Sequence, residues 1–261
     1  MKIPIYIVDA FADKLFTGNP AAVCPLENWL SDITLQNIAS ENNLAETAFF
    51  IKSENNNYHI RWFTPKAEVD LCGHATLATA FVLFELLNYN KEIISFQSRS
   101  GILTVEKLKN WFTLNFPTDK IEKIEITNEL IQCFNKKPIE IYKGLADFMF
   151  VFSNQKEIEK MNPNLDHIAK FKNRGIIITS KGNETDFVSR YFAPAYGINE
   201  DPVTGSAHTT LTPYWSKQLN KKELTAKQLS ERGGFLKCKL LNDRVEISGH
   251  ATLYLKGEIS V

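Results

Sequence analysis

The chain has 261 residues, 44% hydrophobic and 23% charged, and its formal net charge is zero because basic and acidic residues are equal in number. This composition is typical of a folded globular protein and argues against disorder. The absence of a basic surplus argues against nucleic-acid binding. The length suits one large domain or two small ones with an ample core.

The N-terminal residues favour a first strand over a signal peptide, because the stretch from Met1 to Asp9 lacks a long apolar run and a cleavage site. The four cysteines are widely spaced, without a Cys-x-x-Cys pair, so we expect free thiols and a cytoplasmic protein. These cysteines are Cys24, Cys72, Cys133 and Cys238.

In the first half, the hydrophobic pattern predicts mostly strands. Ser31 is expected to cap a helix that ends at Asn42 and Asn43. Residues 53–57 are expected to form a polar turn. Residues 117–120 resemble a linker. The predicted strands are 3–10, 21–25, 46–51, 58–63, 92–97, 101–107 and 110–115.

The second half repeats this rhythm of strands and helices. The β-branched run 175–179 is expected to form a buried strand. The other predicted strands are 140–143, 147–152, 186–192, 225–231, 234–241, 244–248 and 251–259, and the predicted helices are 124–134, 156–161, 165–171 and 205–219.

Residues 74–87 form the most distinctive predicted helix. They include one charged residue, Glu85, and apolar side chains on every face, which is typical of a buried helix. The run is too short to span a membrane. The helix begins at Gly73 and His74, where unpaired backbone N–H groups and the positive end of the helix dipole favour an anion.

An internal duplication connects the two halves. Arg61-Trp-Phe-Thr-Pro65 and Arg190-Tyr-Phe-Ala-Pro194 share three residue types, and each is followed by a loop, a glycine and a helix. The glycines are Gly73 and Gly205, with three more residues before the second. We therefore predict two similar lobes whose helix N-termini face each other across a ligand-binding cleft.

A second repeat has a different interpretation. Gly73-His-Ala-Thr-Leu77 recurs as Gly249-His-Ala-Thr-Leu253, but the later copy continues with strand-like alternation and without a long apolar run. Context overrides local preference, so we expect a strand there and interpret His250 as structural.

Two residues of the first half are candidates for proton transfer. Glu46 opens an apolar strand, and a carboxyl group among apolar residues keeps its proton to higher pH. The alternative is an exposed glutamate at a strand end. His74 lies in the first turn of the buried helix, where it is either a proton donor or substrate contact, or a polar residue hydrogen-bonded to a loop.

Cys72 is a candidate nucleophile or base, because a helix N-terminus lowers the pKa of a thiol. Racemases of the diaminopimelate-epimerase type use two such thiols, one from each half. Here the duplicate position is Thr204, so the sequence lacks the second thiol and favours a small buried cysteine.

The loop 199–208 is the richest in candidate site residues. Asp201 precedes a proline, and the N–H groups of Gly205 and Ser206 open the next helix, where they could bind a carboxylate. The alternative is an ordinary Asp-Pro turn with a Gly-Ser helix start. His208 lies one turn further and is expected to face the core. No spacing of histidines and cysteines indicates a metal site.

Taken together, these motifs resemble the PhzF-like (phenazine biosynthesis) family. The resemblance spans essentially the whole chain, in order. The residues that carry it are Val8-Asp-Ala-Phe, Gly18-Asn-Pro-Ala-Ala-Val23, Glu46-Thr, Arg61-Trp-Phe-Thr-Pro, Cys72-Gly-His-Ala-Thr-Leu-Ala, Asp201-Pro-Val-Thr-Gly-Ser-Ala-His and Ser248-Gly-His-Ala.

The resemblance implies an α+β, duplicated, two-lobe diaminopimelate-epimerase-like fold, in which each lobe is a mixed barrel-like sheet around a central helix. We expect an N-terminal lobe of residues 1–117, completed by 250–261, and a C-terminal lobe of 118–249. The resemblance also implies a homodimer.

The same resemblance implies a cofactor-independent isomerase, without a metal, that shifts a proton on a small carboxylic acid bound between the lobes. Its catalytic residues map onto Glu46, His74, Asp201 and Ser206. The substrate-binding positions are Gly73, Ala75, Gly205, Ala207 and Asn19.

Two other function classes stay open. One is a racemase or epimerase of an amino or hydroxy acid on the same fold, against which the missing second cysteine argues. The other is a non-catalytic protein that binds small acids, against which the complete set of four candidate catalytic residues argues. Nucleic-acid and membrane partners are not expected.

Overall fold

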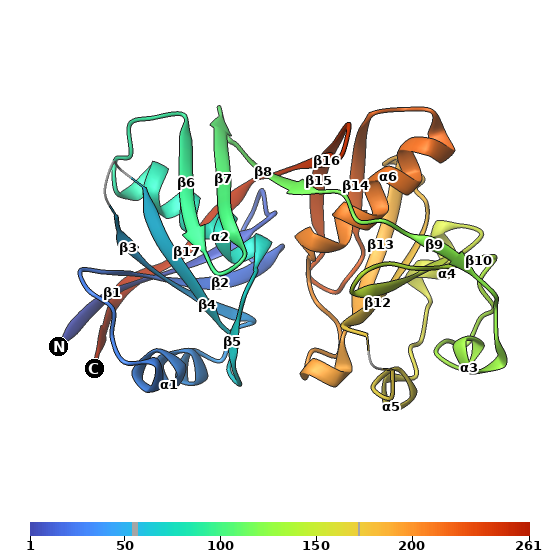
Figure 1. Ribbon diagram of the computed structural model, residues 1–261, viewed down its shortest axis with the longest axis horizontal. Helices are drawn as coiled ribbons and strands as arrows, with labels where there is room; N and C mark the ends of the chain where they lie inside the picture. Colours follow the sequence, from blue (N-terminus) through green and yellow to red (C-terminus); the bar gives the residue numbers. More distant parts are fainter. Residues whose placement is uncertain (54–56, 172) are drawn as a thin grey trace. The chain divides into compact units, whose positions relative to one another are not determined.

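The computed structural model describes residues 1–53, 57–171 and 173–261, so most of the predicted turn 53–57 lies outside the described residues. The chain divides into two compact units (Figure 1). Unit 1 consists of Met1–Asn115 and Ser248–Val261, and unit 2 of Phe116–Ile247. Among the described residues, no helix is long and apolar enough to cross a membrane.

Unit 1 is built on one mixed sheet. Its strands pair in the order β17-β1-β2-β3-β4-β6-β7-β8, parallel at β2/β3 and β4/β6 and antiparallel elsewhere. The bounds are β1 Lys2–Ala10, β2 Asn19–Leu26, β3 Glu46–Lys52, β4 Tyr58–Phe63, β5 Glu68–Val69, β6 Ile93–Ser98, β7 Gly101–Leu108, β8 Trp111–Pro117 and β17 Ala251–Ser260.

The helix α2 (Gly73–Phe81) is enclosed by strands of this sheet. It packs against β1, β2, β3, β7 and β17, and its first eight residues are buried. The hydroxyls of Thr76 and Thr79 donate to the carbonyls of Cys72 and Ala75, so these buried polar groups are satisfied within the helix. A π-helical turn, η2 (Val82–Leu86), continues α2, so the predicted buried helix is confirmed.

The helix α1 (Asp32–Asn42) covers another face of unit 1. The Oγ of Ser31 accepts the backbone N–H of Thr34 at 3.2 Å, as expected for an N-cap, and Asn43 ends the helix in the left-handed conformation. Its buried apolar face consists of Leu35, Ile38 and Ala39.

Unit 2 repeats the pairing of unit 1. Its strands pair in the order β9-β10-β11-β12-β13-β14-β15, parallel at β11/β12 and β13/β14 and antiparallel elsewhere. The strands β17-β1-β2-β3-β4-β6-β7 of unit 1 have the same succession of parallel and antiparallel pairs. The bounds are β9 Glu122–Ile124, β10 Glu140–Lys143, β11 Asp147–Val151, β12 Gly175–Lys181, β13 Phe187–Phe192, β14 Glu223–Gln228, β15 Gly234–Leu241 and β16 Arg244–Gly249.

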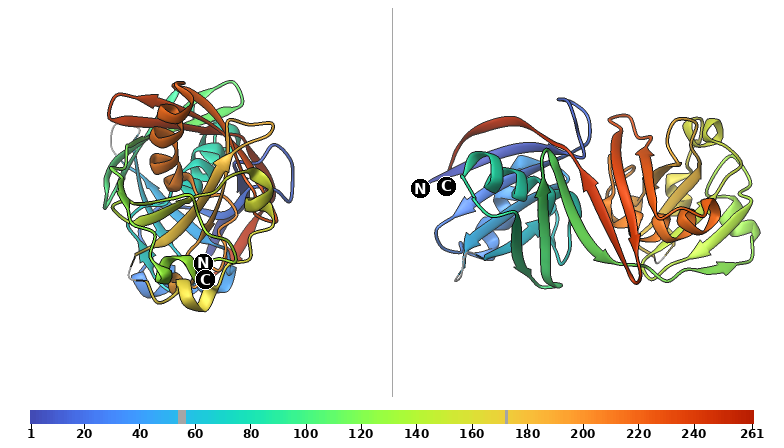
Figure 2. Two further views of the ribbon diagram at one scale, coloured as in Figure 1. Left: turned by 90° about the vertical axis from the view of Figure 1, so that its right-hand side faces the viewer. Right: turned by 90° about the horizontal axis from the view of Figure 1, so that it is seen from above.

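The long helix of unit 2 is α6 (His208–Leu219), which packs on β14 and β15 (Figure 2). The 3-10 turn η4 (Gly205–Ala207) leads into it, so the predicted helix over 205–219 is confirmed with a tighter first turn. The shorter helices are α3 Asn128–Ile131, α4 Gln155–Glu159, α5 Leu165–Ile168 and the 3-10 turn η3 Pro194–Tyr196.

The prediction of one helix over 124–134 was wrong. Ile124 belongs to β9, where it pairs with Ile141 of β10. The hydroxyl of Thr127 then accepts the N–H of Leu130 and starts the four-residue α3. Strand pairing and a cap therefore divide a segment whose apolar spacing is helical.

The two arginines of the repeated motif confirm the duplication in detail. The guanidinium of Arg61 on β4 binds Glu68, and that of Arg190 on β13 binds Glu200, each through two hydrogen bonds of 2.7 and 2.8 Å. Each glutamate precedes the helix-starting glycine by five residues. The three extra residues of the second copy therefore lie between its arginine and its glutamate.

Candidate active site

The predicted site residues of unit 1 converge at the starts of three elements. Asn19 opens β2, Glu46 opens the neighbouring parallel strand β3, and His74 is the second residue of α2. The register pairs Glu46 with Ala21, two residues after Asn19. Parallel pairing thus brings Asn19 and Glu46 to the same edge of the sheet, although they are far apart in sequence.

The imidazole of His74 lies in the middle of this cluster. Its Nε2 is 3.2 Å from Oε2 of Glu46, a close contact that does not meet the geometry of a hydrogen bond. Its Nδ1 is 3.4 Å from Nδ2 of Asn19 and 3.5 Å from Sγ of Cys72. The side chains of His74 and Glu46 are 6% and 12% exposed, so their contact is largely shielded from water.

The charge and tautomer of His74 follow from these surroundings. Burial lowers the pKa of His74 to about 3, so the ring is neutral at pH 7. The amide of Asn19 and the thiol of Cys72 both carry hydrogens and share the single lone pair of Nδ1, whereas an ionised Glu46 carboxylate offers only acceptors to Nε2. We therefore assign the ring proton to Nε2, facing Glu46.

Gly18 explains how Asn19 reaches His74. Its φ is +68°, and a Cβ there would lie 2.2 Å from the carbonyl oxygen of Ala10. Only glycine fits this close approach of two backbone segments. Asn19 is fully buried directly after it.

The predicted site residues of unit 2 lie in the loop before η4. Asp201 is 8% exposed, and its Oδ2 accepts a short hydrogen bond from the hydroxyl of Thr204. Gln228, at the end of β14, is fully buried; its Nε2 donates to the carbonyl of Asp201 at 2.8 Å and to Thr204 Oγ1 at 3.2 Å. Its Oε1 accepts the N–H of Thr204 at 2.9 Å. Gln228 therefore fastens this loop to the sheet.

The remaining predicted residues of unit 2 surround the start of η4. Gly205 and Ala207 are buried and Ser206 is half-buried. His208 is fully buried, as expected, and its Nδ1 donates to the carbonyl of Thr204 at 2.9 Å. Burial lowers the pKa of His208 to about 4, so this ring is also neutral at pH 7.

The structure thus assembles two clusters, one within each unit. Half-site 1 comprises Asn19, Glu46, Cys72, Gly73, His74 and Ala75; half-site 2 comprises Asp201, Thr204, Gly205, Ser206, Ala207 and Gln228. Sequence reasoning missed the contact of Cys72 with His74 and the roles of Thr204 and Gln228. No sequence signal singles out Gln228, a glutamine at the end of a predicted strand.

Half-site 1 also contains three residue types that bind metals. Ligand atoms of Glu46, Cys72 and His74 lie within 4.8 Å of one another. However, Glu46 faces Nε2 of the imidazole and Cys72 faces Nδ1, and one ion binds only one of these nitrogens. The geometry therefore favours separate contacts on the two sides of the ring rather than three ligands around one ion.

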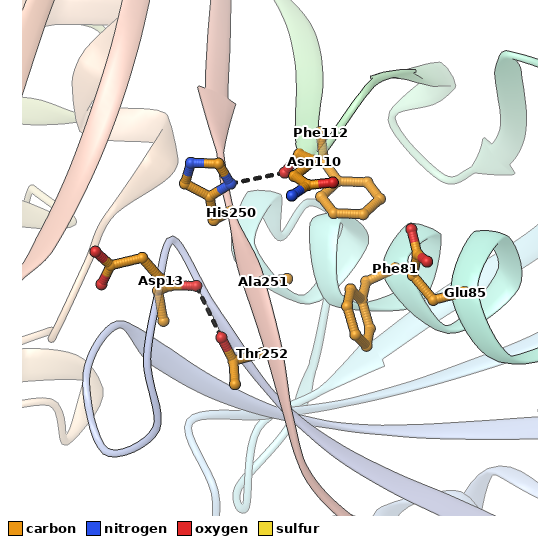
Figure 3. Close-up of a pocket in the computed structure, with 9 residues that line it drawn as sticks. Asp13, Phe81, Glu85, Asn110, Phe112, His250, Ala251 and Thr252 are labelled. Atoms are coloured by element: carbon orange, nitrogen blue, oxygen red, sulfur yellow. Dashed lines mark hydrogen bonds between the residues drawn. The ribbon is translucent and has the colours of Figure 1, made fainter.

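The second copy of the repeated pentapeptide lies elsewhere in unit 1. His250 Nδ1 donates to the carbonyl of Asn110 at 2.7 Å (Figure 3). Its ring also packs on Trp111, consistent with a structural role. A cavity of about 450 Å³ adjoins it, lined also by Phe81, Glu85 and Phe112. This cavity contains none of the predicted site residues.

The fold has clear relatives among solved structures. A PhzF-family phenazine biosynthesis protein of Enterococcus faecalis superimposes with a TM-score of 0.97 and 48% sequence identity over 100% of both chains. A hydroxyproline epimerase of Agrobacterium vitis, at 8% identity, matches 99% of this chain and 92% of its own with a TM-score of 0.62. The fold is therefore the duplicated epimerase-like fold that the motifs implied.

Sequence comparison is more specific. The family model described as phenazine biosynthesis-like protein matches residues 8–257. An uncharacterized isomerase of Halalkalibacterium halodurans is 47% identical over 263 residues, covering 99% of this chain and 99% of the relative. The chain belongs to the phenazine biosynthesis-like (PhzF) family, whose relatives include proteins named as isomerases.

Proposed function

We propose that the protein is a cofactor-independent isomerase that moves a proton from one carbon to another on a small carboxylic acid. The observation that carries the proposal is the contact between Glu46 and His74, 3.2 Å apart and shielded from water at the entrance of α2. A carboxylate held beside a neutral imidazole suits general acid–base catalysis.

In this proposal Glu46 removes a proton bound to carbon and returns it at another carbon. Neutral His74 keeps its Nε2 proton toward Glu46 and orients the carboxylate, and Asn19 fixes the ring. Removal and return of the proton leave the substrate balanced, so neither an oxidant nor a second reactant is needed. In heavy water the protonated Glu46 exchanges with solvent before it returns a hydrogen, which brings deuterium to carbon.

Asp201 and Ser206 of half-site 2 complete the proposed catalytic set. The N–H groups at Gly73, His74 and Ala75 and those at Gly205, Ser206 and Ala207 bind the substrate carboxylate, since helix starts stabilise negative charge. Charge that develops when the carbon-bound proton leaves is stabilised in the same way.

Deuterium exchange tests this proposal. A set of small carboxylic acids is incubated with the protein in heavy water, and NMR follows uptake at carbon. We expect uptake with at least one acid, and loss of about 10²–10⁴-fold in Glu46→Gln. Glu41→Gln, an exposed site in the same unit, is the matched control. Full turnover in Glu46→Gln would refute the mechanism.

The same experiment separates the alternatives. A racemase or epimerase would exchange the proton at a stereocentre and equilibrate the two configurations without moving a double bond. The similarity to the fold of a hydroxyproline epimerase favours including amino and hydroxy acids in the set. A protein that only binds acids would show thermal stabilisation without any exchange.

We further propose a homodimer, from the family resemblance, and a cytoplasmic location, from the widely spaced cysteines. Sedimentation velocity at micromolar concentration tests the first, with a single monomeric species as the contradicting result. Cell fractionation tests the second.

A further inference from the structure

The two half-sites share a feature that the duplication places at equivalent positions. Cys72 and Thr204 each precede the helix-starting glycine, and both have the extended backbone of an N-cap residue. An N-cap side chain ordinarily accepts a backbone N–H of the first turn. Neither Cys72 nor Thr204 makes such a bond.

Instead, each side chain lies against an ionisable group of its own unit. Sγ of Cys72 is 3.5 Å from Nδ1 of His74, and Oγ1 of Thr204 makes its short hydrogen bond to Oδ2 of Asp201. His74 and Asp201 are two of the four residues in the proposed catalytic set. Two positions related by duplication thus contact one such residue each.

The direction of the bond in half-site 2 follows from Gln228. The amide Nε2 of Gln228 donates to Oγ1 of Thr204 at 3.2 Å, which uses an acceptor site of the hydroxyl. The hydroxyl hydrogen is then left for Asp201, whose ionised carboxylate offers only acceptors. Thr204 is therefore the donor and Asp201 the acceptor.

The direction in half-site 1 follows from Glu46. Its carboxylate beside Nε2 favours the tautomer with the ring proton at that nitrogen, so Nδ1 is an acceptor. The thiol of Cys72 is then a donor to Nδ1, whose single lone pair it shares with the amide of Asn19 at 3.4 Å. Cys72 and Thr204 are both less than one-tenth exposed, so water competes little for either bond.

We propose that Cys72 and Thr204 are paired positioning residues: each donates a hydrogen bond that fixes the protonation state and orientation of the acid–base group of its own half-site. Cys72, together with Asn19, holds neutral His74 in the tautomer that faces Glu46, and Thr204 orients the carboxylate of Asp201. The catalytic consequence rests on the proposed function, but the hydrogen-bond donation itself does not.

Serine provides a matched test at both positions, because its hydroxyl is a donor of similar size. Cys72→Ala and Thr204→Val remove the donor, whereas Cys72→Ser and Thr204→Ser keep one. We expect the donor-free variants to lose deuterium exchange between about tenfold and hundredfold, and the serine variants to recover most of that loss. A Cys72→Ser variant as impaired as Cys72→Ala would overturn the assignment and indicate chemistry by the thiol itself.

The pH profile separates positioning from a general effect on folding. Thr204→Val withdraws the donor that favours the Asp201 carboxylate, so the acidic limb of the exchange rate should move to higher pH. Thr204→Ser should leave that limb near its original position. An unmoved limb in Thr204→Val contradicts the role assigned to Thr204.

A substrate-free measurement decides the role of Cys72 independently. Nitrogen-15 NMR of labelled histidine reports the tautomer of each buried ring, with signals assigned through His74→Asn and His208→Asn. We expect an Nε2–H tautomer for His74 and the opposite Nδ1–H tautomer for His208, which donates through Nδ1. Cys72→Ala should shift the Nδ1 signal of His74, and Cys72→Ser should restore it.

An Nδ1 signal of His74 that does not change in Cys72→Ala would overturn the proposal even if exchange activity exists. Conversely, if no carboxylic acid exchanges, the proposed function fails while the tautomer measurement still decides whether Cys72 donates. Urea unfolding of each variant confirms that the fold persists.

Discussion

Arg190 holds Glu200 through two nearly parallel hydrogen bonds, 2.7 Å from Nε and 2.8 Å from Nη2. Its remaining nitrogen, Nη1, donates to the carbonyls of Ile158 and Met161 at 3.1 and 2.9 Å. Glu200 directly precedes Asp201, so this one guanidinium connects the loop of half-site 2 to the core of unit 2.

Arg190→Lys should destabilise the protein by about 1–3 kcal/mol, because an ammonium replaces the planar fork and leaves carbonyls unpaired. Urea unfolding measures the loss. Lys2→Ala, which removes the exposed pair of Lys2 with Glu258, serves as the control and should change stability by less than about 1 kcal/mol. Equal effects of the two substitutions would contradict the role of Arg190.

Stability should fall as the pH drops from about 6.5 toward 4. His74 and His208 have pKa values lowered to about 3 and 4 by burial, whereas in the unfolded chain both titrate near the ordinary value. Below that value the unfolded state binds protons that the folded state does not. Between the folded and unfolded pKa values, the free energy of unfolding changes by up to ~1.4 kcal/mol per pH unit for each histidine.

Urea midpoints at pH 7.5 and pH 5 measure this dependence. His208→Asn removes one titrating group and should reduce the slope. Equal stability of the parent chain at the two pH values would contradict the buried neutral state of both rings.

Gly18→Ala should cost about 3 kcal/mol or more, because the new Cβ would lie 2.2 Å from a backbone oxygen in addition to the positive φ. Gly233→Ala is a matched control, since Gly233 has a φ of +62° but its nearest neighbouring atom lies 3.6 Å from the added Cβ. That substitution should cost only about 1 kcal/mol. Thermal unfolding of both variants separates the clash from the backbone strain.

Three of the four thiols should resist alkylation in the native protein at pH 8. Burial raises the pKa of Cys24, Cys133 and Cys238 to about 12, so none forms an appreciable thiolate there. All four cysteines are free, so denaturant should expose four reactive thiols. Mass spectrometry after iodoacetamide treatment locates the label, and rapid native labelling at Cys238 would contradict this expectation.

Strands and caps were the most predictable part of the fold. The strands at Tyr58–Phe63 and Gly234–Leu241 have the predicted bounds, because alternation and flanking polar residues define them locally. The segment 124–134 was mispredicted, because pairing between Ile124 and Ile141 is a tertiary effect that local spacing does not encode.

The candidate site was predictable only where short motifs carried it. Glu46 and His74 were named from the sequence, and the structure brings them together. The bond of Thr204 to Asp201 was not foreseen, because threonine before a helix start ordinarily caps that helix. The contact of Cys72 with His74 depends on side-chain rotamers that the motif Cys72-Gly73-His74 does not reveal.

Unit 2 is continuous in sequence, whereas unit 1 combines the first 115 residues with the last 14. Translation therefore produces β1 first, and its partner β17 only after all of Phe116–Ile247. The edge of β1 stays open in the nascent chain until the final strand emerges. Synthesis from the N-terminus thus favours folding of unit 2 before unit 1 is complete, and the unpaired edge of β1 is open to wrong pairing until β17 binds it.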